Sequence, residues 1–156
     1  MSKKDYSKQL GKRQRIKETT LVVGVDIGRQ FNAVGFMNKE GKVLGKYPKV
    51  FNSRAGFDYF VATVEEVKAK HGLTEVLIGL EPTGHYWRNL AYFAKDRGYA
   101  VRFIRTTALK HQRELDESSS AKNDLRDAIT LANITRECKY IDTVIEDGVY
   151  RQLKRA

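Results

Sequence analysis

Residues 21–26 spell Leu-Val-Val-Gly-Val-Asp, a β-branched apolar run that is too short for a helix and ends on an acid. We interpret this run as a buried strand with Asp26 at its end. Residues 75–80, Glu-Val-Leu-Ile-Gly-Leu, repeat the pattern and are followed by Glu81 and the helix breaker Pro82. The two runs predict neighbouring buried strands of one sheet, each followed by a carboxylate.

The segments around these two runs complete the predicted order of elements. Turn residues and hydrophobic periodicity mark the boundaries, with Ser53 as an N-cap and Gly72 as a helix terminator. The expected elements are strands at 31–37, 42–50 and 99–104, and helices at 53–71, 85–97, 106–116 and from residue 121 or 122 onward. Three antiparallel strands followed by alternating helices and strands predict an α/β fold with a mixed sheet.

The chain has the length of one domain and carries a strong positive charge. Its 156 residues have a formal net charge of +10 and a pI of about 9.7, which favours a polyanionic partner or an anionic membrane surface. Residues 1–20 contain seven Lys or Arg and two acids, a net charge of +5 with hardly any large apolar side chain. We therefore expect a disordered basic arm over residues 1–20.

The sequence contains no apolar run typical of a signal peptide or a membrane span, so we expect a cytoplasmic protein without membrane attachment. Cys138 is the single cysteine, which excludes a disulfide or a cysteine-based zinc site within one chain. We interpret Cys138 as a small core residue.

The last predicted helix carries two acids on one side. With 100° per residue, Asp124 and Asp127 lie about 60° apart and share a face with Ala128, Leu131 and Cys138. Buried carboxylates require a cationic partner. That partner could be Arg126, Lys122 or Arg102, or the helix could be turned so that both acids face solvent.

Together with the two acids at the strand ends, this helix would form a cluster of four carboxylates. Hard oxygen ligands without cysteine or an organised histidine set suit Mg²⁺ or Mn²⁺. Two such ions can stabilise the attacking and leaving oxygens of a phosphodiester displacement. We expect Asp26, Glu81 and Asp124 to bind metal directly, with Asp127 as a fourth ligand or as a supporting group.

Three motifs in this order resemble those of the DEDD insertion-sequence transposases, a family whose amino-terminal domain is similar to the RuvC junction resolvase. The motifs are Gly-Val-Asp-Ile-Gly at 24–28, Glu-Pro-Thr-Gly-His-Tyr-Trp at 81–87 and Ala-Lys-Asn-Asp-Leu-Arg-Asp-Ala at 121–128. The resemblance implies an RNase H-like catalytic domain over residues 21–140 that cleaves and exchanges DNA strands. It also assigns the four catalytic and metal-binding acids to Asp26, Glu81, Asp124 and Asp127.

The chain departs from the family pattern in places. Many relatives have Lys-Thr-Asp where this chain has Lys-Asn-Asp at 122–124, and Asn-Pro where it has Arg-Thr-Thr at 105–107. The family continues into a second domain with a nucleophilic serine, so we expect residues 141–156 to begin a connecting helix and the chain alone to be inactive in strand transfer. We interpret the three serines at 118–120 as a linker and helix N-cap rather than that nucleophile.

The resemblance further implies a structured guide RNA, donor and target DNA, and assembly into dimers or tetramers. A solvated charged surface is the alternative to phosphate binding for each candidate cation. The candidates are Lys12, Arg13, Arg15, Arg102, Arg105, Lys110, His111, Arg113 and Lys122. We expect Tyr86 and Trp87 to form a buried aromatic pair at a helix start rather than to stack on bases. His85 has two alternative roles, a phosphate contact or a residue at the helix start.

Three other functions compete with a transposase catalytic domain. One is a noncatalytic RNA- or DNA-binding module, and another is a stand-alone RuvC-like nuclease that cuts four-way junctions. The third is a sugar-kinase or actin-like ATPase, which also presents an Asp-x-Gly turn to phosphates. The ATPase requires two related lobes and a second glycine-rich phosphate loop, and 156 residues provide about one lobe without that loop.

Overall fold

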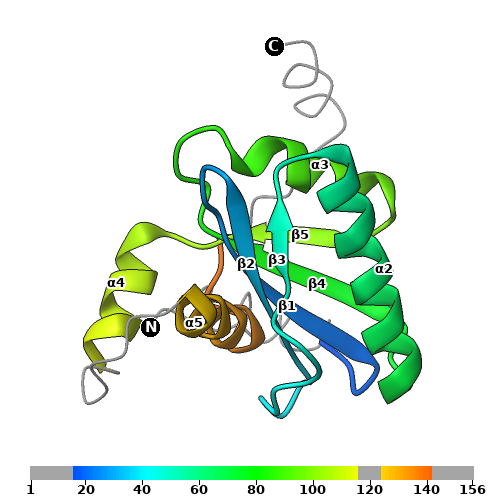
Figure 1. Cartoon of the computed structure of the whole chain (residues 1–156). Helices are drawn as coiled ribbons and strands as arrows, with labels where there is room; N and C mark the ends of the chain where they lie inside the picture. Colours follow the sequence, from blue (N-terminus) through cyan, green and yellow to red (C-terminus); the bar gives the residue numbers. More distant parts are fainter. Residues whose placement is uncertain (1–15, 116–123, 142–156) are drawn as a thin grey trace.

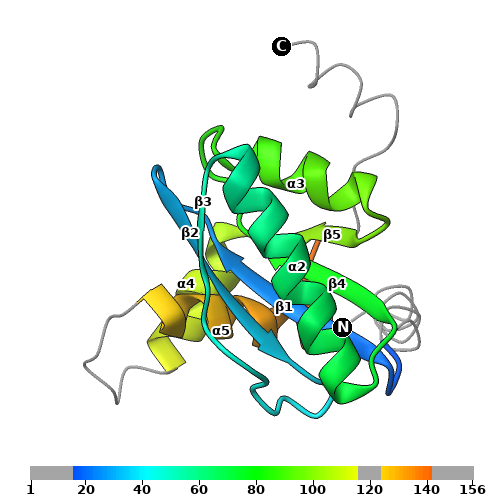
Figure 2. The same ribbon diagram turned by 45° about the vertical axis from the view of Figure 1, so that its right-hand side comes forward.

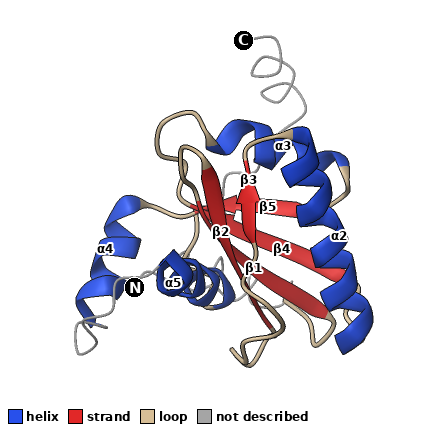
Figure 3. Cartoon of the chain, in the orientation of Figure 1, coloured by secondary structure: helices blue, strands red, loops and turns tan. Residues whose placement is uncertain are grey.

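A computed structural model describes residues 16–115 and 124–141. The alternation of strands and helices in this part of the chain follows the predicted order (Figure 3). The strands are β1 (Thr20–Asp26), β2 (Phe31–Met37), β3 (Lys49–Phe51), β4 (Glu75–Leu80) and β5 (Ala100–Phe103). The helices are α2 (Arg54–His71), α3 (Trp87–Asp96), α4 (Thr106–Leu115) and α5 (Asp124–Arg136).

The five strands form one mixed sheet with β1 at its centre. The strand order is β3-β2-β1-β4-β5, with β1, β2 and β3 antiparallel and with β4 parallel to both β1 and β5. Helices α2 and α3 cover one face, and α5 covers the other with α4 packed beside it (Figures 1 and 2). This confirms the predicted α/β fold with an antiparallel meander.

The apolar residues of β1 are buried on both faces of the sheet because helices cover both. Leu21, Val23 and Val25 belong to the core under α2 and α3. Val22 packs on the opposite face with Met37 and Ala132. This two-sided burial accounts for the continuous apolar run, since successive side chains of a strand point to opposite faces.

A row of three glycines lets α5 lie directly on the sheet. Gly24 pairs with Gly35 of β2 and with Gly79 of β4, so the three stand side by side across the central strands. A Cβ atom at Gly24 would overlap the backbone carbonyl oxygen of Ala128, and one at Gly79 would overlap the hydroxyl of Thr135. The absence of side chains in this row therefore sets how closely α5 approaches the sheet.

Local capping signals of α2 agree with the sequence interpretation. The hydroxyl of Ser53 accepts a hydrogen bond from the backbone N–H of Gly56 at 3.0 Å, which makes Ser53 the N-cap. Gly72 ends the helix with a φ of 67°, a conformation that glycine adopts without a Cβ penalty. Cys138 is buried in the core beside α5, as predicted.

The predicted strand at 42–50 is wrong over most of its length. Strand β3 contains only Lys49–Phe51, and Val43 contributes an isolated bridge to Met37. Gly45 has a φ of 68°, and Pro48 has no N–H to donate to a ladder. The apolar pattern of this segment thus belongs to an irregular connection.

Other predicted boundaries shift by a few residues. Helix α3 begins at Trp87 rather than residue 85, and β5 is shorter at both ends than the predicted 99–104.

The predicted arm ends before residue 20, because Ile16 is 3% exposed and Thr20 already belongs to β1. Ile141, placed in the predicted connecting segment, donates its N–H to the carbonyl of Phe103 at 2.8 Å. Residues 1–15, the serines at 118–120 and residues 142–156 lie outside the described residues.

Within the described ranges, no helix combines the length and the apolar character needed to cross a membrane.

A side chain added to the glycine row tests the close packing of α5 on the sheet. Replacing Gly24 with Ala should lower the free energy of unfolding by about 3 kcal/mol or more, because the new methyl group meets the backbone of α5. Gly35→Ala is the matched control, since its methyl group would meet the flexible end of Ile129 at 2.7 Å and should cost less. Urea unfolding of both variants measures the difference, and equal costs would contradict the close packing at Gly24.

Candidate active site

Two of the predicted site residues stand side by side at one edge of the sheet. The last residue pair between β1 and β4 is Val25 with Leu80, and Asp26 and Glu81 are the next residues on the two parallel strands. Neighbouring strands lie about 4.8 Å apart. The structure thus brings together the two acids that the sequence places at strand ends.

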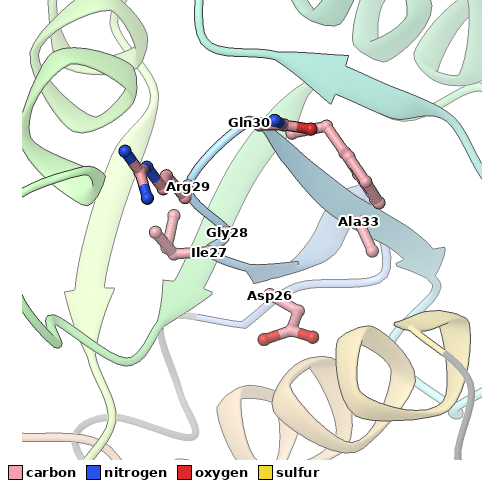
Figure 4. A pocket seen from close by; sticks show the side chains of 7 residues that line it. Asp26, Ile27, Gly28, Arg29, Gln30 and Ala33 are labelled. Atoms are coloured by element: carbon pink, nitrogen blue, oxygen red, sulfur yellow. The ribbon is translucent and has the colours of Figure 1, made fainter.

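Both acids belong to the face of the sheet that α5 covers. Asp26 follows Gly24 by two positions and Glu81 follows Gly79 by two, and the side-chain directions at both glycines lead to α5. Figure 4 shows the carboxylate of Asp26 pointing toward this helix. The helix that carries the other two predicted acids therefore lies over the same face.

One carboxylate oxygen of Glu81 accepts a hydrogen bond, and the other is buried without a hydrogen-bond partner among the described residues. The hydroxyl of Thr83 donates a short hydrogen bond to Oε1 of Glu81. Oε2 is buried and has no hydrogen-bond partner among the described residues. A buried carboxylate oxygen without a donor is unfavourable unless a cation approaches it, so this atom fits the role of a metal ligand.

Helix α5 begins at Asp124, whose side chain lies outside the described part. Asp127 is half-buried and directly precedes Ala128, the residue whose carbonyl lies over Gly24. Among the side chains that the structure describes, no three His, Cys, Asp or Glu form a group that could hold a metal ion. The structure therefore brings Asp26 and Glu81 together and places Asp127 on α5, the helix that covers their face of the sheet, while the contributions of Asp124 and Asp127 to a metal site stay predictions.

Among the three cations that the sequence offers as partners of the acids, Arg126, Lys122 and Arg102, the structure directs Arg102 elsewhere. Its Nη1 donates to the carbonyl of Val101 at 3.1 Å, and its guanidinium lies 5.9 Å from the ring centroid of Tyr140. Within the described part of the chain, Arg102 forms no ion pair with Asp26 or Glu81. Lys122 is outside the described residues.

The predicted nucleic-acid contacts fall into three groups. Arg105, Lys110 and His111 are exposed on α4 or just before it, whereas Arg102 is half-buried. The side chain of Arg113 is not described, and the remaining candidates lie outside the described ranges. These remaining candidates are Lys12, Arg13, Arg15 and Lys122.

The aromatic pair at the start of α3 is buried only in part. Trp87 packs edge-on against Phe103 at 5.2 Å and donates its indole N–H to the carbonyl of Gly84 at 3.1 Å. Tyr86 is 37% exposed and lies 4.3 Å from the ring of His85, which is exposed as well. The predicted burial is therefore correct only in part for Trp87, which is half-buried, and wrong for Tyr86.

A buried amide network that the sequence analysis missed holds the turn after Asp26. Asn32 is fully buried, and its Oδ1 accepts the N–H of Gly28 at 3.0 Å. Its Nδ2 donates to the carbonyl of Val50 at 3.3 Å and to Oδ1 of Asn52 at 2.8 Å. Asn52 in turn donates to the carbonyls of Gly28 and Arg29, each at 2.9 Å. Asn32, a polar residue within the otherwise apolar run of β2, was the sequence signal for this network.

This turn borders a pocket of about 350 Å³ that opens beside Asp26. Its lining comes from the end of β1, the turn and the start of β2 (Figure 4). The lining residues are Asp26, Ile27, Gly28, Arg29, Gln30, Phe31 and Ala33. The site thus combines a carboxylate with a cation, an amide and an aromatic ring, a mixture suited to a polar, charged substrate.

The model of the IS110-type DEDD transposase family, described as "Transposase", matches residues 23–156. The chain belongs to this transposase family. A comparison with curated protein sequences finds no match.

Solved structures support the fold that this family assignment implies. The RuvC protein of T. thermophilus, solved in complex with a Holliday junction substrate, is similar with a TM-score of 0.50 and 15% identity, over 78% of this chain and 98% of RuvC. The transposase domain therefore has the RuvC-like, RNase H-like fold. A ROK family glucokinase from Streptomyces griseus gives a TM-score of 0.40 and 19% identity, over 65% of this chain and 38% of the glucokinase. A ROK hexokinase from Thermus thermophilus gives a TM-score of 0.40 and 14% identity, over 64% of this chain and 38% of the hexokinase.

The amide network generates a second prediction about stability. Asn32→Ala should lower the free energy of unfolding by about 1–3 kcal/mol, because it leaves the half-buried N–H of Gly28 and the buried carbonyl of Val50 without their side-chain partner. Asn38→Ala is the control, since Asn38 makes an exposed hydrogen bond to the N–H of Lys42 and should cost less. Urea denaturation measures both, and an equal or smaller loss for Asn32→Ala would contradict the role of the network.

Proposed function

We propose that this transposase domain cleaves and exchanges DNA strands with a divalent-metal site built from Asp26, Glu81, Asp124 and Asp127. The observation that carries the proposal is the alignment of Asp26 with Glu81, whose buried Oε2 has no hydrogen-bond donor in the described part of the chain. Membership of the DEDD transposase family supports the same four acids.

The donor set suits Mg²⁺ or Mn²⁺, because carboxylate oxygens are the ligands that these ions prefer. Asp26 and Glu81 hold one side of the site from the sheet, and Asp124 and Asp127 hold the other from α5. When bound, two ions supply positive charge to the attacking and leaving oxygens of a phosphodiester. The protein residues bind the ions, orient the strand and keep the Asp26 turn rigid through Asn32.

We further propose that the exposed cations beside the site hold the nucleic-acid backbone. Arg105, Lys110 and His111 lie on or next to α4, on the side of the sheet that α5 covers (Figure 1). The net charge of +10 supports a polyanionic partner. Donor and target DNA, a structured guide RNA and a homodimer or homotetramer in the cytoplasm complete this proposal, which family membership supports.

Isothermal titration calorimetry with Mn²⁺ tests the metal site. We expect Asp26→Asn and Glu81→Gln each to weaken Mn²⁺ binding by more than about tenfold, because each removes a direct ligand. Asp58→Asn is the matched control, since Asp58 lies on α2 across the sheet and pairs with Arg54 at 3.4 Å. Equal binding by the wild type and Asp26→Asn would contradict the metal site.

Salt-dependent DNA binding tests the basic surface. Lys110→Ala should weaken binding uniformly across DNA sequences and reduce the slope of log K against log salt by about one. Lys70→Ala, an exposed lysine near the end of α2, is the control and should change neither quantity. Fluorescence anisotropy from low to moderate salt measures both variants.

The DNA-binding assay and the Mn²⁺ titration together separate a catalytic domain from a noncatalytic binding module. Wild-type protein that binds DNA without Mn²⁺ uptake would support the noncatalytic module. Cleavage of four-way junctions by this chain alone would instead favour a stand-alone nuclease.

A further inference from the structure

The face of the sheet that carries the acids continues outward into an aromatic and basic strip. Ala33 of β2 pairs with Asp26 on one side and with Lys49 of β3 on the other. One step farther from the glycine row, Phe31 pairs with Phe51. Asp26, Ala33 and Lys49 thus form one row across three strands, and the two phenylalanines form the next. We call Phe31, Lys49 and Phe51 the edge strip.

The edge strip is open to solvent although two of its three side chains are aromatic. Phe51 is 58% exposed, Lys49 is exposed and Phe31 is half-buried. The two rings lie 6.2 Å apart in an edge-on arrangement, and Nζ of Lys49 lies 4.8 Å from the ring centroid of Phe31. Phe31 also lines the pocket beside Asp26. The strip is therefore continuous with the proposed catalytic edge.

The charge at the strip favours a polyanion as its occupant. Lys49 belongs to the strip, and Arg29 lines the pocket that Phe31 also lines. Residues 27–38, which form the turn and β2, and the three residues of β3 contain no Asp or Glu. A protein strand adding to this edge would find only the three residues of β3 to pair with, and a lysine among them.

From these observations, and resting on the function proposed above, we infer that the edge strip binds single-stranded DNA next to the cleaved bond. An unstacked base packs on the rings of Phe31 and Phe51, and Lys49 contacts the neighbouring phosphate. Base stacking on exposed aromatic rings is a sequence-tolerant way to hold a strand, and the row from Asp26 to Lys49 aligns that strand with the acids. The strip is a positioning site for substrate and takes no part in bond breaking.

Fluorescence quenching of a single-stranded DNA oligonucleotide containing 2-aminopurine tests this inference on the full chain. The buffer contains EDTA, so that the metal site makes no contribution. We expect Phe51→Ala to weaken binding by about five- to a hundredfold and to reduce quenching, while Phe51→Trp restores both. Tyr59→Ala is the matched control, because Tyr59 is 50% exposed on α2 and lies across the sheet from the strip.

Several outcomes would overturn the inference. Wild-type affinity and quenching in Phe51→Ala would do so, as would an equal loss in Tyr59→Ala. A Phe51 effect seen with single-stranded RNA but not with DNA would assign the strip to RNA. A change in sedimentation of Phe51→Ala with unchanged DNA binding would assign it to a contact between copies of the chain.

The result is separable from the proposed metal site. Asp26→Asn should keep the Phe51-dependent quenching in EDTA even though it loses Mn²⁺ binding. Failure of the Mn²⁺ titration would therefore leave the edge strip standing, and failure of the quenching assay would leave the metal site standing.

Discussion

Helix α5 lies in close contact with three aligned glycines of the sheet, and this contact positions the other parts of the domain. Gly35, Gly24 and Gly79 stand in one row across β2, β1 and β4, and any side chain at Gly24 or Gly79 would overlap α5. A helix that approaches a sheet this closely also fixes the height of its own side chains above the strands. This packing lays α5 over the face to which Asp26 and Glu81 belong, because each of these acids follows a row glycine by two positions.

Hydrogen bonds hold the turn after Asp26 from the opposite face of the sheet. Asn32 and Asn52 tie the turn after Asp26 to β3, with every polar atom of the Asn32 amide engaged to at least one partner. Glu81 differs, since its Oε2 is buried without a donor in the described part. A buried carboxylate oxygen without a donor is unfavourable unless a cation approaches it, so this atom supports the proposed metal site.

The sheet edge and the active site form one functional surface in this interpretation. The order of strands places the acids at β1 and β4 and the cations and aromatic rings at β2 and β3. Lys49 lies in the row of Asp26 because β2 pairs antiparallel with both β1 and β3, and Phe51 lies in the next row. A nucleic-acid strand crossing this face would meet stacking surfaces and then carboxylates within the width of the sheet.

The order of elements, the mixed sheet, the family and the placement of Asp26 and Glu81 at strand ends could be predicted from the amino-acid sequence, because apolar runs that end on acids are local signals. It misjudged residues 42–50, where Gly45 and Pro48 interrupt an otherwise strand-like pattern, and it placed Tyr86 inside the protein. The alignment of three distant glycines, the hold of Asn32 on the turn and the place of Lys49 in the row of Asp26 became visible only in the folded chain. These facts depend on strand register, which is set by pairing and helix packing between segments far apart in the chain.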